Sequence, residues 1–101
     1  MEPKHYPNWR DIVVYSEHPQ PQIIEENPKY KSVILGLEAG AKIPPHAEGP
    51  AIFHFLEGTG RVMVAEKTYS IQSGSTVIVP DGAARGIEAE TRLAILAVRV
   101  L

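Results

Sequence analysis

Apolar residues recur along most of this chain in short runs that glycine, proline and polar residues interrupt. These runs predict strands at Asp11–Tyr15, Gln22–Ile24, Tyr30–Leu37, Ala51–Gly58, Gly60–Ala65, Thr68–Ile71, Thr76–Pro80, Ala84–Ala89 and Arg92–Leu101. Short strands at intervals of roughly 8–12 residues are typical of a sandwich or barrel. No stretch has a convincing apolar period of 3.6 residues, so we expect an all-β protein.

The remaining segments predict how the domain is organised. Residues 1–10 contain two prolines and many polar groups, and we expect an irregular arm there. The run EAGAKIPPH, residues 38–46, is interpreted as a turn and connection. We expect one domain overall, in which residues 1–29 form an N-terminal arm and edge strands that pack on a barrel core of residues 30–101.

The strand AIFHFL has a strict alternation that assigns its two faces. Ala51, Phe53 and Phe55 fall on one face, and Ile52, His54 and Leu56 fall on the other. We expect the aromatic face to fill the barrel and the face with His54 to look outward.

Two longer segments carry a family resemblance. Residues 40–58 read GAKIPPHAEGPAIFHFLEG, and residues 74–89 read GSTVIVPDGAARGIEA. In the order and spacing of their glycine, proline and histidine residues they resemble the two signature motifs of the cupin family. This resemblance implies a single cupin-type jelly-roll β-barrel with an irregular N-terminal arm.

The second motif matches the family in spacing without a gap. Gly74, Pro80 and Gly82 occupy its three structural positions. Arg85 stands where the family places a metal-binding histidine, and Ala89 stands at the position of the asparagine. The second motif therefore keeps the structural residues of the family but lacks the metal-binding histidine.

The first motif is also altered. Gly40 and His46 match, Glu48 falls where the second histidine is expected, and Ala51 falls at the metal-binding glutamate. Alignment from the other end of the motif would instead make His46 the second histidine and put Pro44 at the first. We prefer the first alignment because it keeps the spacing from Gly40 intact.

Family members commonly hold iron, manganese, nickel, copper or zinc on three histidines and one glutamate, so the resemblance implies either no cofactor or a single divalent metal here. Ala51 has no donor atom, and the guanidinium of Arg85 would repel a cation. A metal set of His46, Glu48 and His54 would suit non-haem iron or zinc, provided that the strand carrying His54 flips register or bulges.

A different use of the same positions is ligand binding. An arginine inside a small barrel is costly unless it is paired, and Glu48 is the internal partner that we expect for Arg85. Our hypothesis is that Arg85, with His46 alongside, orients a polar or anionic small molecule. Phe53 and Phe55 would supply apolar walls. The alternative for Arg85 is a solvated position at the barrel mouth.

Composition narrows the possible partners. Ten basic and twelve acidic residues give a net charge of −2 without a basic block, so we expect no nucleic-acid binding. The chain has no cysteine, which excludes thiolate catalysis and zinc–sulfur sites. The first ten residues lack an apolar signal region, and no apolar run approaches the ~20 residues of a membrane span. We therefore expect a cytoplasmic protein without membrane contact.

Three functions follow from these observations. The leading one is a small-molecule-binding cupin with a lost or altered metal site. The alternative is a metal-dependent cupin enzyme, an oxygenase, isomerase or lyase that uses a His/Glu site. The third is an inert barrel that serves as a structural partner. In each case we expect a homodimer, because outward-facing Ile52 and Leu56 and the apolar run Leu93–Leu101 are hard to cover in a lone barrel.

Overall fold

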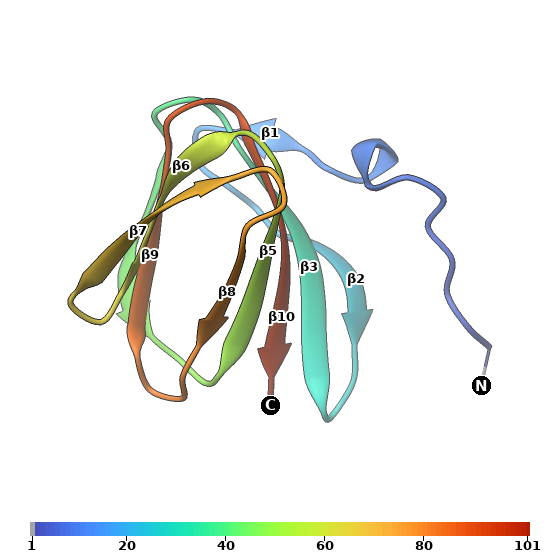
Figure 1. The fold of residues 1–101 in the computed structure, drawn as a ribbon. Helices are drawn as coiled ribbons and strands as arrows, with labels where there is room; N and C mark the ends of the chain where they lie inside the picture. The colour runs from blue at the N-terminus through green and yellow to red at the C-terminus, as the bar shows by residue number, and fades with distance from the viewer. Residues whose placement is uncertain (1) are drawn as a thin grey trace.

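The computed structural model describes residues 2–101 and consists of two β-sheets that face each other (Figure 1). After a 3-10 turn at Trp9–Asp11, the strands in chain order are β1 Tyr15–Ser16, β2 Gln22–Glu26, β3 Tyr30–Leu37, β4 Lys42–Ala47, β5 Ala51–Glu57, β6 Thr59–Val64, β7 Lys67–Gln72, β8 Thr76–Val79, β9 Ala84–Ala89 and β10 Leu93–Val100. The predicted all-β jelly roll is confirmed. None of the helices among residues 2–101 is long and apolar enough to cross a membrane.

Strands distant in sequence pair in both sheets. The first sheet has the order β1-β3-β10-β5-β8, with β2 also pairing with β3, and the second has the order β4-β9-β6-β7. The sheets form two layers and do not join into one closed ladder of hydrogen bonds. The C-terminal strand β10 runs antiparallel between β3 and β5 at the centre of the first sheet.

The alternation predicted for AIFHFL is confirmed in β5. Ala51, Phe53 and Phe55 are buried between the sheets, whereas Ile52 and His54 on the other face are at least partly exposed. β10 lies at the centre of the same sheet, and its consecutive residues Leu93, Ala94 and Ile95 are all fully buried. The inward faces of the two sheets thus supply the hydrophobic core.

Gly58 closes the connection between β5 and β6. Its φ of +95° lies in the left-handed region, and a Cβ atom at this position would collide with the carbonyl of Arg92. Only glycine meets both conditions without strain.

One predicted connection is instead a strand. Residues 42–47 form β4, the edge strand of the second sheet, although the sequence contains Pro44 and Pro45. The register with β9 shifts between Ile43 and His46, so the prolines lie in an irregularity of the ladder. Proline is tolerated there because an edge strand does not need every amide as a donor.

One predicted strand is largely wrong. Within Asp11–Tyr15 only Tyr15 is in a strand, and Asp11 belongs to the 3-10 turn. Asn8 caps that turn by accepting a hydrogen bond from the amide of Arg10 at 3.0 Å. A local cap therefore decides the conformation over the β propensity of the apolar residues that follow.

Tyr15 fastens the start of β1 to the first sheet. Its hydroxyl donates a hydrogen bond of 2.9 Å to Glu57 at the end of β5. The guanidinium of Arg92 lies over the tyrosine ring, 4.7 Å from its centre. Burial, followed by the bond to Glu57, raises the pKa of Tyr15 to about 12. This contact lies at the end of β5 opposite to Ala51, where the strand begins.

Candidate functional site

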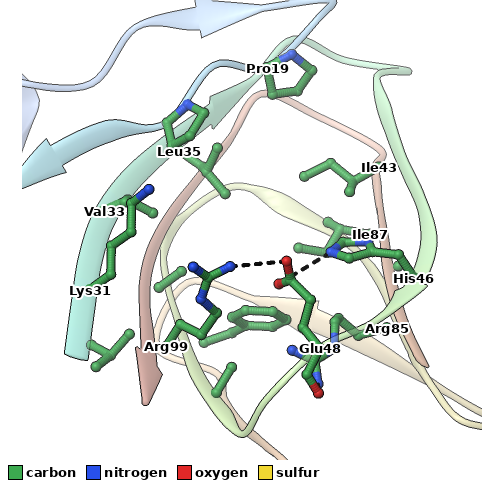
Figure 2. Close-up of a pocket in the computed structure, with 16 residues that line it drawn as sticks. Pro19, Lys31, Val33, Leu35, Ile43, His46, Glu48, Arg85, Ile87 and Arg99 are labelled. Carbon is green, nitrogen blue, oxygen red and sulfur yellow. Dashed lines mark hydrogen bonds and ion pairs between the residues drawn. The ribbon is translucent and has the colours of Figure 1, made fainter. Parts of the chain in front are cut away.

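A cavity of about 320 Å³ lies between the sheets at the end where β5 and β9 begin and β10 finishes (Figure 2). Its walls come from strands of both sheets and from two prolines before β2, and the residues are Pro19, Pro21, Lys31, Val33, Leu35, Ile43, His46, Glu48, Ala51, Phe53, Arg85, Gly86, Ile87, Ala97, Val98 and Arg99. Most of them are apolar.

Two small inward side chains, Ala97 on β10 and Ala51 on β5, line the cavity and leave space between the sheets. On β10, the buried Leu93 and Ile95 are followed on the same face by Ala97 and Arg99. On β5, the fully buried Phe55 fills the closed end, and Ala51 stands at the open end. One half of the barrel is therefore packed and the other half is hollow.

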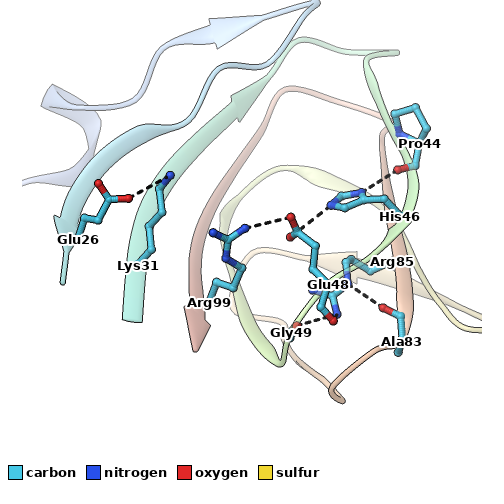
Figure 3. Close-up of polar contacts among 9 residues, drawn as sticks. All are labelled: Glu26, Lys31, Pro44, His46, Glu48, Gly49, Ala83, Arg85 and Arg99. Atoms are coloured by element: carbon cyan, nitrogen blue, oxygen red, sulfur yellow. Dashed lines mark hydrogen bonds and ion pairs between the residues drawn. The ribbon is translucent and has the colours of Figure 1, made fainter. Parts of the chain in front are cut away.

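Arg85 is buried in the wall formed by β9, with 2 % of its surface exposed. Its Nε donates to the carbonyl of Ala83 at 2.9 Å, and its Nη2 donates to the carbonyls of Glu48 and Gly49 at 3.0 and 2.8 Å (Figure 3). The guanidinium thus joins the loop that precedes β5 to the loop that precedes β9. It bonds the main chain of Glu48, whereas the sequence led us to expect a pair with the side-chain carboxylate.

The carboxylate of Glu48 points across the cavity mouth to different partners. Its Oε1 accepts a hydrogen bond of 3.0 Å from Nη1 of Arg99, and its Oε2 lies 3.4 Å from Nε2 of His46. The other ring nitrogen of His46 lies 3.2 Å from the carbonyl of Pro44. His46, Glu48 and Arg99 therefore form a polar chain from β4 to β10 (Figure 3).

Arg99 is a site residue that the sequence analysis did not identify. It lies opposite Lys31 in the register of β10 with β3, and both side chains line the cavity. Its Nε is buried and has no hydrogen-bond partner among residues 2–101. Alternation along β10 from Ile95 would have placed it on the inner face.

The predicted aromatic wall is only partly present. Phe53 lines the cavity, whereas Phe55 is fully buried in the packed half and is not part of the cavity wall. The difference follows from the two-residue step along β5, which carries Phe55 deeper between the sheets. Of the four residues that we predicted to bind a ligand, the structure thus brings together His46, Phe53 and Arg85.

His54 lies on the outer face of β5. Its Nδ1 lies 2.7 Å from the hydroxyl of Thr76 on the neighbouring strand β8. β5 pairs with β8 in register at His54, and the register shift in its pairing with β10 lies beyond it, between Phe55 and Glu57, so His54 is not turned inward. The structure does not bring His54 to His46 and Glu48.

The residues present do not fit the metal site that the motif resemblance implies. Among residues 2–101, no three His, Cys, Asp or Glu side chains are grouped so that they could hold a metal ion. Glu48 already faces Arg99 and His46, and a cation near it would also meet the positive charges of Arg85 and Lys31. Such surroundings favour anions over cations.

Comparison with known proteins gives one family and a consistent fold. The family model described as "Cupin domain" matches residues 33–99. No curated protein matches the chain.

The similar solved structures share the fold at low sequence identity. A protein from Thermus thermophilus is 21 % identical with a TM-score of 0.87, and the alignment covers 99 % of this chain and 97 % of that one. A conserved protein of unknown function from Streptococcus pyogenes is 20 % identical with a TM-score of 0.86, over 99 % and 90 % of the two chains.

An enzyme is also among the similar structures. Salicylate 1,2-dioxygenase from Pseudaminobacter salicylatoxidans is 23 % identical with a TM-score of 0.68, and the alignment covers 71 % of this chain and 21 % of that one. At this identity the likeness shows the fold alone.

Proposed function

The chain belongs to the cupin family, and from this premise we propose that it is a binding protein that holds a small polar or anionic molecule in the hollow half of its barrel. The observation that carries the proposal is the cavity of about 320 Å³, which has apolar walls and charged groups gathered at its mouth. Ligand sites have this composition because apolar surface supplies affinity and a few polar groups fix orientation.

The charged groups support an anionic or polar guest over a cation. Lys31, Arg85 and Arg99 line the cavity, and Glu48 is its one carboxylate among the described residues. His46 lies beside Glu48 at the mouth, where 48 % of the histidine side chain is exposed and accessible to a ligand.

The proposal is tested by binding experiments on untagged protein. A panel of small neutral and anionic compounds should include at least one that raises the thermal midpoint. Ala97 lines the cavity, so Ala97→Leu would fill the space and should abolish that rise. If no compound binds, or if Ala97→Leu binds equally well, the ligand is not held in the cavity and the proposal fails.

Metal analysis of the same untagged protein tests the enzymatic alternative. The binding proposal predicts less than stoichiometric iron, manganese, nickel, copper or zinc. A stoichiometric metal that is lost in His46→Ala would replace the binding protein with a metal-dependent oxygenase, isomerase or lyase.

We also propose that two copies associate through the outer face of β5 and β8. Ile52 and Ile78 lie opposite each other in the pairing of these strands, and 40 % and 66 % of their surfaces are exposed. The N-terminal arm and the outer face of this sheet line a groove together, and that groove includes Ile34, Leu56 and Leu96 but neither Ile52 nor Ile78. Light scattering at micromolar concentration should give a dimer, and Ile78→Asp should give a monomer. A monomeric wild-type protein would contradict the proposal.

A further inference from the structure

The strongest unexplained feature of the cavity is the guanidinium of Arg99. Its Nη1 donates to Glu48 at 3.0 Å. Its Nε is buried without a partner, and Nη2 makes no hydrogen bond within residues 2–101. Nε and Nη2 together form the edge of an arginine that can hold both oxygens of a carboxylate. This edge is free in Arg99.

The environment of Arg99 contains a second cation, Lys31, which also lines the cavity. Lys31 faces it directly in the register of β3 with β10, and like charges at such positions repel. The nearest carboxylate to Lys31 is that of Glu26, at 3.5 Å and largely exposed. In Figure 2 the guanidinium of Arg99 lies between Lys31 and Glu48. Glu48 therefore bonds Nη1 of Arg99, and it leaves Nε and Nη2 without a hydrogen-bonded anion within residues 2–101.

We propose that this free edge, together with Lys31, is the subsite for the carboxylate of a small organic acid whose apolar body lies in the cavity. The inference rests on the proposed binding function and names its ligand class. Val33, Phe53 and Ala97 line the space next to these two cations, so an aromatic or branched aliphatic group fits the walls. Arg85 cannot offer the same edge to a carboxylate, because its Nε and Nη2 are already bonded to carbonyls.

Benzoate is the probe for this subsite, with benzamide as its neutral counterpart and phenyl phosphate as its phosphate counterpart. Titration calorimetry on the untagged protein should show benzoate binding at least tenfold more tightly than benzamide, a difference of about 1.4 kcal/mol. Equal affinity of benzoate and benzamide would overturn the carboxylate subsite. Tenfold tighter binding of phenyl phosphate than of benzoate would also overturn it.

Substitutions of the residues around the guanidinium of Arg99 test whether benzoate binds at this subsite. Arg99→Lys keeps the charge but loses the planar edge, and it should weaken benzoate binding at least tenfold. Lys31→Met should weaken it about fivefold through the lost charge. Glu48→Gln removes the neighbouring negative charge and should tighten it about threefold, a gain that misfolding does not produce. The matched control is Arg61→Lys, because Arg61 is exposed on β6 and pairs with Glu88.

The failure of this inference differs from the failure of the proposed function. If Arg99→Lys and Lys31→Met bind benzoate as the wild type does, while Ala97→Leu does not, the cavity binds ligands but the subsite is wrong. If no compound binds in a way that depends on Ala97, both statements are wrong.

Discussion

On the β9 wall of the cavity, Arg85 gives three hydrogen bonds to main-chain carbonyls. On the β10 wall, Arg99 gives one hydrogen bond to the carboxylate of Glu48, and its buried Nε has no partner within residues 2–101. The two side chains share one cavity and one residue type. Both residues lie on strands, but loop carbonyls of Ala83, Glu48 and Gly49 accept hydrogen bonds from Arg85, whereas Arg99 bonds only a side chain within residues 2–101. The bonds from Arg85 to the main chain indicate a structural role, and the buried unbonded Nε of Arg99 indicates a place for a ligand.

Of the changes that test this comparison, removal of Arg85 should lower the stability of the protein most. Arg85→Met would leave the carbonyls of Ala83, Glu48 and Gly49 without this donor, and we expect the free energy of unfolding to fall by about 2–4 kcal/mol. Urea denaturation measures the change. Arg61→Met, at an exposed position, is the control and should stay within about 0.5 kcal/mol. A similar loss in both variants would show that Arg85 has no special structural role.

A larger side chain should destabilise the protein more next to Arg85, on the β9 wall, than on the β10 wall that carries Arg99. A Cβ on Gly86, beside Arg85, would lie 2.9 Å from Cε of Met63 and 3.0 Å from the carbonyl of Ile43. We expect Gly86→Ala to lower the free energy of unfolding by about 1–3 kcal/mol. Ala97→Val, on the β10 wall, extends into open cavity and should cost less than Gly86→Ala. The opposite order in chemical denaturation would mean that the β10 wall is the tighter one.

Removing Arg99 should have a smaller effect than either change on the β9 wall. Arg99→Met loses a half-buried ion pair with Glu48, but it also removes a buried unpaired donor and the repulsion of Lys31. We expect the free energy of unfolding to change by less than about 1 kcal/mol in either direction. A loss as large as that of Arg85→Met would make both walls structural and would contradict the difference drawn between them.

Tyr15 lies at the end of β5 away from the cavity. Its titration should have the smallest effect on stability, and it serves as a reference for the cavity variants. Because the folded pKa of Tyr15 is raised from 10.0 to about 12, its contribution to stability is complete below pH 10 and is lost as the pH rises through 12. Tyr15→Phe should reduce the fall of the thermal midpoint between pH 10 and 12. Arg85→Met and Arg99→Met should leave that fall unchanged, and a change in it would show that the effects are not local to the cavity.

The sequence predicted elements best where a period of two residues coincides with a buried sheet. Tyr30–Leu37 has the predicted bounds, and the two faces of AIFHFL are assigned correctly. The prediction of strands was wrong where local effects and tertiary pairing compete with the propensity of the residues. The cap by Asn8 turns residues 9–11 into a 3-10 helix, and the pairing of β4 with β9 makes a strand of a segment with two prolines.

The cavity residues were harder to predict for a different reason. The motif placed Arg85 and His46 in the site, but hydrogen bonding to carbonyls depends on loop conformations that the motif spacing does not encode. Arg99 was missed because apolar residues stand at nearly every position of Leu93–Leu101, which hides the alternation of Ile95, Ala97 and Arg99. A charged residue at the end of such an apolar run is a signal worth examining in other small barrels.

Glu48 contributes to the barrel in two independent ways. Its carbonyl accepts hydrogen bonds from Arg85 and from the amide of Gly82, at 3.0 and 2.8 Å, whereas its side chain meets His46 and Arg99. Every amino acid supplies the same carbonyl, so mutational drift at position 48 leaves the loop anchored. Related barrels could therefore diversify their guests by exchanging this single side chain, and a library randomised at this codon is a direct route to altered selectivity.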